Sequence, residues 1–121
     1  MKTLLLTCVV LVSAFPSVAQ ERVRIEVSAS ERTREAIAET VRLNPYIQGG
    51  QMRGLQAFGI RAGSLFDRIG LKQQEVIVSV NGEAFPSADI YKAIQSDSVV
   101  ELRIRAQSGA QRTVLLELVE H

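Results

Sequence analysis

Apolar and charged residues alternate in two parts of the chain, and this two-residue period is typical of half-buried β-strands. The first part is Val23–Val27. The second runs from Val100 to Arg105, and apolar residues again fall at every second position in 114–118, after a Ser108-Gly109 turn. The pattern therefore predicts an N-terminal strand and a C-terminal β-hairpin.

A helical period follows the first strand. Ser28 and Glu31 have the spacing of a capping box, in which each side chain binds the backbone N–H of the other residue. Ile37 and Val41 are four residues apart and so share one face of a helix. Asn44-Pro45 comes next, and proline disfavours helical geometry in the residue before it. We expect a helix from about Glu31 to Val41 that Asn44-Pro45 ends.

The middle of the chain predicts short elements separated by glycine. Gly49-Gly50 indicates a turn, and Leu55 to Ile60 is apolar enough for a buried strand. Ser64 to Ile69 predicts one or two helical turns, and Gly70 suits the left-handed residue that ends a helix.

A strand and a helix follow before the hairpin. Val76 to Val80 is rich in β-branched residues and ends at Asn81-Gly82, a dipeptide typical of tight turns. Ser87 can cap a short helix from Ala88 to Gln95, with its two isoleucines on one side.

These elements predict one small α+β domain. Its sheet should be mainly antiparallel, forming a partly open β-barrel or sandwich, with two to three short helices. The length of 121 residues fits a single domain, and 46% hydrophobic with 22% charged residues is typical of a globular protein. We divide it into an N-terminal strand and helix at 20–44 and a main domain at 45–121.

The first 19 residues have the pattern of an export signal. Lys2 supplies a positive charge, an apolar run extends from Leu4 to Ala14, and Pro16 follows. Ser17-Val18-Ala19 offers small residues at the positions that a signal peptidase needs. The run is shorter than the roughly 20 apolar residues that span a bilayer. We expect cleavage after Ala19 and a periplasmic chain; the alternative is an uncleaved anchor that leaves the chain associated with the inner membrane.

Cleavage would remove the only cysteine, Cys8, and leave a chain without net charge. The 14 Lys and Arg residues would fall to 13, which equals the number of Asp and Glu residues. A neutral domain is a poor candidate for binding nucleic acid or anionic lipid. We expect membrane contact only if the signal is uncleaved.

The residue types needed for catalysis or metal binding are missing from the sequence. The single histidine, His121, is the last residue, where it cannot be held as a general base. One histidine and one cysteine make no metal site, and the glycines at 49–59 lack the spacing of dinucleotide or phosphate loops. We expect no enzyme activity, no cofactor and no small-molecule substrate.

Much of the chain resembles a bacterial PDZ domain. The segments that carry the resemblance are Gly54-Leu55, Phe58 to Phe66, Ile69-Gly70-Leu71 and Val76 to Gly82. The likeness extends upstream to the predicted helix and Pro45-Tyr46. Within that family, the sequence is similar to the C-terminal PDZ domain of the type II secretion system protein C, an inner-membrane component that contacts the outer-membrane secretin.

The resemblance implies a module that binds a peptide or protein C-terminus. PDZ domains add an extended peptide as a strand to an open sheet edge, and a glycine-containing loop offers N–H groups to the terminal carboxylate. By resemblance, Gly50 to Leu55 is that loop, Leu55 to Ile60 is the edge strand, and Ala88–Gln95 is the opposite wall. The candidate binding residues are Arg53, Gly54, Leu55, Gln56, Ala57, Phe58, Ala88 and Tyr91.

Four of these candidates also have a purely structural interpretation. Gly54 can serve only a turn, Leu55 and Phe58 can belong to the core, and Arg53 can be a solvated surface residue. The sequence leaves these alternatives open.

Three departures from the family pattern limit what the resemblance implies. Gln74-Glu75 stands where Gly-Asp is usual. The groove helix that starts at Ala88 ends by Asp97, about one turn earlier than in the secretion protein. We also expect no counterpart of the membrane anchor and the secretin-contacting domain of protein C. We expect an accessory or component related to type II protein secretion. The alternatives are a general periplasmic adaptor that presents polypeptides to a protease or chaperone, and a structural module that self-associates.

Overall fold

The computed structural model describes residues 19–120. The predicted export signal covers residues 1–19, and all of it except Ala19 lies outside the described part of the chain. No helix within the described part is long and apolar enough to cross a membrane.

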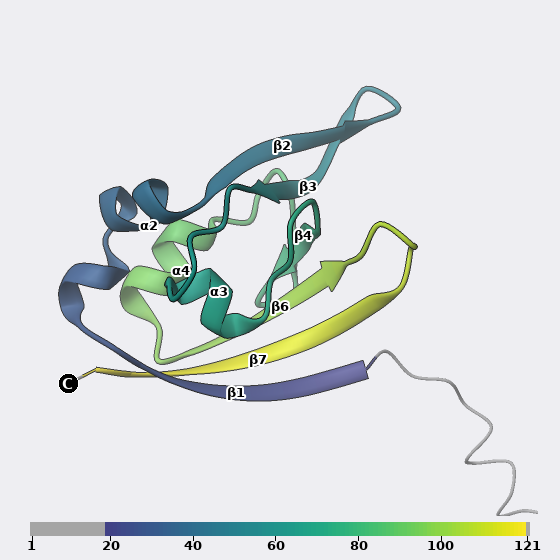
Figure 1. The fold of residues 1–121 in the computed structure, drawn as a ribbon. Coiled ribbons are helices and arrows are strands. Elements are labelled where there is room, and N and C mark those ends of the chain that lie inside the picture. The colour runs from purple at the N-terminus through teal and green to yellow at the C-terminus, as the bar shows by residue number, and fades with distance from the viewer. Residues whose placement is uncertain (1–18, 121) are drawn as a thin grey trace, which may run out of the picture.

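The fold is a curved, open sheet with its helices on the inner side (Figure 1). Its elements are, in chain order, β1 (Ala19–Val27), η2 (Ala29–Arg32), α2 (Arg34–Thr40), β2 (Arg42–Gln48), β3 (Gln51–Phe58), α3 (Leu65–Ile69), β4 (Val76–Val80), β5 (Glu83–Ala84), α4 (Ile90–Ser96), β6 (Val99–Arg105) and β7 (Gln111–Glu120). The strand order is β1-β7-β6-β4-β3-β2, with β5 attached to β4. The β1–β7 pair is parallel and the other pairs are antiparallel. The predicted fold class is therefore confirmed.

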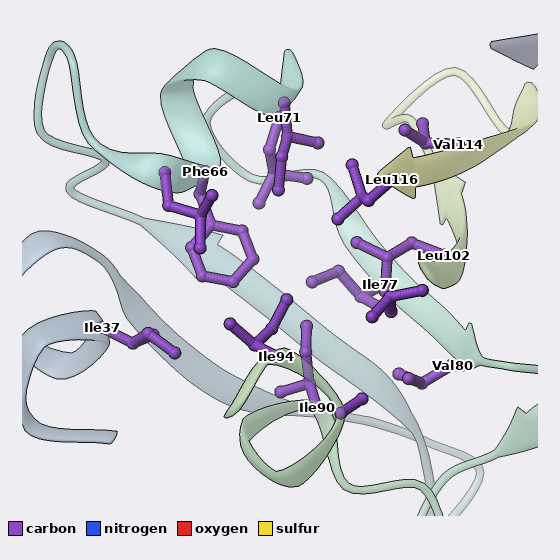
Figure 2. Packing of buried hydrophobic residues seen from close by; sticks show 14 of the residues in the cluster. Ile37, Phe66, Leu71, Ile77, Val80, Ile90, Ile94, Leu102, Val114 and Leu116 are labelled. Atoms are coloured by element: carbon purple, nitrogen blue, oxygen red, sulfur yellow. The ribbon is translucent and has the colours of Figure 1, made fainter. Parts of the chain in front are cut away.

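The core fills the space between the sheet and the helices (Figure 2). Phe66 of α3 and Ile37 of α2 are almost wholly buried. They pack into one cluster with the two isoleucines of α4 and with the inner side chains of the central strands. The largest fully buried members from these other elements are Ile77, Ile90, Ile94, Leu102, Ile104 and Leu116. This cluster holds the helices in fixed positions relative to the strands.

The N-terminal segment is built into the same sheet. β1 pairs with β7 from Ala19↔Arg112 to Val27↔Glu120, and it adds Ile25 and Val27 to the core. The boundary that we placed at 44/45 falls inside β2.

The predicted helix from Glu31 to Val41 is two shorter helices, so that prediction was wrong. Thr33 interrupts it with extended backbone (φ −73°, ψ 155°), and its Oγ1 accepts a hydrogen bond of 3.1 Å from the Ala36 N–H. Thr33 thus caps a new helix, α2. The Glu31 carboxylate does accept from the Ser28 N–H at 3.0 Å, as the capping box predicted.

Two further boundaries differ from the predictions. Asn44-Pro45 lies inside β2 and does not end the helix, because α2 has already ended at Thr40. The cap of α4 is Asp89 and not Ser87, because the Asp89 carboxylate accepts from the Lys92 N–H at 3.1 Å. Helix α3, strand β4, the C-terminal hairpin and the glycine at the end of α3 (φ 95°) are confirmed.

Candidate functional site

The strand that we expected at the open edge lies inside the sheet. β3 pairs with β2 from Gln51 to Phe58 and with β4 at Leu55↔Ile77 and Gln56↔Val76. The prediction of an edge strand at Leu55 to Ile60 is therefore wrong, since both sides of β3 have neighbours.

The eight predicted site residues differ in how far they reach solvent. Gly54, Ala57 and Ala88 are buried, so they cannot form the wall of an open groove. Arg53 is exposed and borders a surface hollow of about 520 Å³ with Phe85 and Pro86. The remaining four, which are Leu55, Gln56, Phe58 and Tyr91, are half-buried.

The open edge on this side of the sheet is β2. The strand order ends at β2, and within residues 19–120 its only strand partner is β3. Pro45 lies in the middle of β2, and proline within a sheet is found at edges because it cannot donate to a ladder. Ile47, further along the strand, is 58% exposed. Apart from Pro45, which has no N–H, the outer backbone groups of β2 are thus available to an added strand.

Half-buried apolar side chains lie near this edge. Leu43 of β2 and Met52 and Leu55 of β3 all pack against the core without being fully covered. An extended segment along β2 would have apolar contacts as well as backbone hydrogen bonds.

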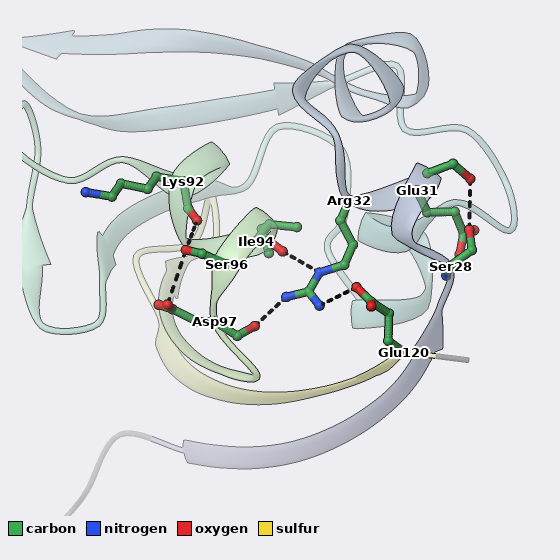
Figure 3. Close-up of polar contacts among 9 residues, drawn as sticks. Ser28, Glu31, Arg32, Lys92, Ile94, Ser96, Asp97 and Glu120 are labelled. Carbon is green, nitrogen blue, oxygen red and sulfur yellow. Dashed lines mark hydrogen bonds and ion pairs between the residues drawn. The ribbon is translucent and has the colours of Figure 1, made fainter.

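Helix α4 is held at its C-terminal end by a buried arginine (Figure 3). Arg32 of η2 is 8% exposed and donates through Nε to the Ile94 carbonyl at 2.7 Å. It also donates to the Asp97 carbonyl and forms an ion pair of 3.1 Å with Glu120. These carbonyls belong to the end of α4, where helices have unsatisfied acceptors.

A second contact joins α2 to the exposed side of α4. The guanidinium carbon of Arg34 lies 4.4 Å from the centre of the Tyr91 ring, within the range of a cation–π interaction. Tyr91, which the sequence analysis placed in the binding groove, therefore has α2 as its neighbour.

A cluster of charges lies elsewhere, where Arg112 of β7 pairs with Glu75, the residue before β4, and with Glu21 of β1 at 3.7 Å. Arg112 contacts both carboxylate oxygens of Glu75 at 2.8 and 3.1 Å and donates to the Gly70 carbonyl at 2.9 Å. Burial alone would raise the pKa of Glu75, but hydrogen bonds from Arg112 and the Lys72 N–H, with the two positive charges, hold this pKa below its ordinary value. The hydrogen bond to Glu75 in turn raises the pKa of Arg112. This pair stabilises the fold, since both members are engaged by the protein.

The described residues contain no group of three potential metal-ligating side chains. The arrangement offers a sheet edge, apolar contacts and surface charge, which suit binding of a polypeptide. The sequence analysis missed β2 itself. Pro45 was the available indication, because an edge strand tolerates a proline that a central strand does not.

No family model and no curated protein matches this sequence. In structure, the chain is similar to two solved forms of the PDZ domain of EpsC from Vibrio cholerae. The form with residues 204–305 has a TM-score of 0.55 and 20% sequence identity, covering 74% of this chain and 88% of that one. The form with residues 219–305 has a TM-score of 0.50 and 21% identity, covering 67% and 97%. The resemblance to PDZ domains is thus confirmed at the level of the fold.

Proposed function

The chain has a PDZ fold, and from this premise we propose that it binds an extended segment of a partner protein as an added strand along β2. The observation that carries the proposal is the open β2 edge beside half-buried apolar residues. Strand addition satisfies the outer backbone groups of β2 and gives affinity largely independent of the partner's sequence. Side-chain contacts from β2, β3 and α4 then provide selectivity.

The biological setting that we propose is type II protein secretion, with the chain acting in the periplasm as a non-enzymatic accessory or component. The similarity to the EpsC PDZ domain supports this setting, together with the sequence resemblance to protein C. The export-signal pattern at residues 1–19 agrees with a periplasmic place of action. A secretion-system component is then the expected partner.

Self-association is the second candidate, because the sheet leaves two strands at its edges. Both β1 and β2 end the strand order, and unpaired edges are templates for pairing with another copy. The charged outer residues of β1 oppose pairing of two copies at that edge, while Pro45 limits any ladder along β2 to a short one, whether a copy or a partner adds it. We therefore rank this candidate below binding of a different protein.

Photo-crosslinking in the native host tests the proposal. A photoreactive residue replaces Ile47 on β2, and a matched control carries it at Arg24 on β1, the opposite edge of the sheet. We expect the Ile47 position to capture a type II secretion component that the Arg24 position does not capture.

The other outcomes separate the alternatives. A spread of exported proteins captured through their C-termini would favour a general adaptor, and capture of a second copy would favour self-association. Equal capture from both positions would contradict binding along β2.

A further inference from the structure

Asn81 is followed by Gly82, and an asparagine before a glycine is open to a general chemical reaction. The Gly82 backbone nitrogen attacks Cγ of the Asn81 side chain, and the side-chain nitrogen leaves as ammonia with the proton that Gly82 loses. The product is a succinimide ring, which water opens to an aspartate or isoaspartate residue. The sequence has one other asparagine, Asn44, which precedes Pro45. Because a proline nitrogen carries no hydrogen, Asn81 is the asparagine that can react in this way.

The fold places this pair where water can reach it. Asn81 and Gly82 form the two-residue turn between β4 and β5. Both are exposed and both have a positive φ, of 53° and 81°. A Cβ on Gly82 would meet no atom within 4 Å, and a surface hollow of about 160 Å³ opens beside Asn81. The water that the reaction uses therefore has access to the turn.

Hydrogen bonds hold the Asn81 side chain away from the reacting geometry. Its Oδ1 accepts from the Glu101 N–H at 2.8 Å, and its Nδ2 donates to the Asp97 carboxylate at 3.1 Å. The Asn81 N–H also donates to the Glu101 carbonyl at 2.7 Å. Ring closure needs Cγ within reach of the Gly82 nitrogen, and moving the side chain there strains both of its bonds. The bond to Asp97 is the one that joins this turn to another element, α4.

The reaction would add a negative charge where carboxylates are already in excess. Glu83, Asp89 and Asp97 line the hollow, and Lys92 is the one cation among the described residues that do so. An aspartate side chain has no N–H to give, so two carboxylates would face each other in place of the present hydrogen bond. Asp97 is also the C-cap of α4, and its carbonyl accepts from Arg32 (Figure 3). The new charge would therefore act on the end of α4.

From these contacts we propose that Asn81 is a site of spontaneous deamidation, that its hydrogen bond to Asp97 sets the rate, and that the product loosens the end of α4. Each reacting chain consumes one water and releases one ammonia. The inference goes beyond the proposed strand addition along β2 and does not depend on it.

Peptide mapping by mass spectrometry tests the site and the control of the rate. The purified chain is kept in mildly alkaline buffer, and replacement of NH₂ by OH is followed at both asparagines. Asn81 should be converted and Asn44 should not. Asp97→Ala should convert Asn81 at least about threefold faster, because one hydrogen bond no longer restrains the amide. Glu83→Ala is the matched control, since it removes a carboxylate of the same hollow other than the one that Asn81 binds, and its rate should change by less than about 1.5-fold.

Thermal unfolding followed by circular dichroism tests the effect of the product. Asn81→Asp reproduces the new charge and should lower Tm by about 4–8 °C. Asn81→Asp combined with Asp97→Asn exchanges the acceptor and the donor across the same contact. This double variant should recover most of the loss, because one hydrogen bond replaces the repulsion.

Four results would overturn the inference. Equal rates in the unmodified chain and Asp97→Ala would contradict control by Asp97, and conversion of Asn44 in place of Asn81 would contradict the assignment of the site. No conversion of Asn81 in either folded protein, while the urea-unfolded chain is converted, would show that the fold excludes the reaction. Equal Tm values of Asn81→Asp and the double variant would show that the new charge does not act through Asp97.

Discussion

Gly54 shows why one position in the predicted binding loop is reserved for glycine. A Cβ at this position would overlap the backbone oxygen of Ile77 and lie 2.7 Å from Cγ1 of Val76. The backbone of β3 therefore approaches β4 more closely than any other residue would permit. The role of Gly54 is close packing of two strands, and its buried position agrees with this.

We predict that Gly54→Ala lowers the free energy of unfolding by about 2–3 kcal/mol, because the strands must separate to admit the methyl group. Gly109→Ala is the matched control. Gly109 has a positive φ (95°) but open space around it, so its substitution should cost only about 1 kcal/mol. Urea unfolding of both variants measures the difference, and equal losses would contradict the steric explanation.

Glu75 and Arg112 give the fold a defined pH dependence. Because the folded pKa of Glu75 lies below its ordinary value, the pair stabilises the fold at neutral pH. This contribution is lost as the pH falls from about 5 through the folded pKa. Arg112 stays charged throughout, since its pKa is raised.

We expect Glu75→Gln to lower the free energy of unfolding by about 2–4 kcal/mol at pH 7, because it leaves Arg112 without its buried partner. The difference in free energy of unfolding between this variant and the unmodified chain should become smaller at pH 4 and 3, where Glu75 itself becomes protonated. Urea unfolding of both proteins at the three pH values measures this difference. A difference that stays constant would show that the charge of Glu75 does not stabilise the fold.

At the scale of elements, side-chain contacts join the η2–α2 segment to α4. Arg32 satisfies two carbonyls at the end of α4, and Arg34 contacts Tyr91 on its side. Helix α4, which we place beside the proposed site, is therefore held in position by the η2–α2 segment, far from it in the sequence. Neither contact can be predicted from sequence spacing, because the partners are about sixty residues apart.

We predict that Arg32→Met lowers the free energy of unfolding by about 2–3 kcal/mol, because the carbonyls of Ile94 and Asp97 lose a charged donor. Amide exchange should also become faster in α4 than in β6, which Arg32 does not contact. Arg32→Lys keeps the charge but not the forked geometry. Its free energy of unfolding should therefore lie between those of Arg32→Met and the unmodified chain. Unchanged exchange in α4 would contradict the role that we assign to Arg32.

At the scale of the whole molecule, the sequence predicts where each helix or strand lies along the chain better than it predicts which strands pair with one another. β4 and the C-terminal hairpin were predicted because β-branched runs and turn dipeptides act within a few residues. The position of β3 between two strands depends on pairing with β2, and Arg42–Gln48 lacks a clean alternation that would mark it as a strand. Pro45 was assigned to a helix end because the same ring that ends a helix also fits an edge strand.

The position Gln74 illustrates the same limit at a turn. It stands where the family usually has glycine, and it adopts a positive φ of 70°. The turn is kept although the residue is unfavourable there. A global fold can thus hold a local conformation that the sequence alone argues against.

The most direct test of the central claim is amide hydrogen exchange of the purified chain with and without an octapeptide of alternating serine and valine that ends in a free carboxyl group. Strand addition along β2 predicts slower exchange on binding at Leu43 and neighbouring β2 amides that face away from β3, while Arg24 on β1 stays unchanged. Protection confined to β1, or to the hollow beside Arg53, would place the ligand elsewhere and contradict the account.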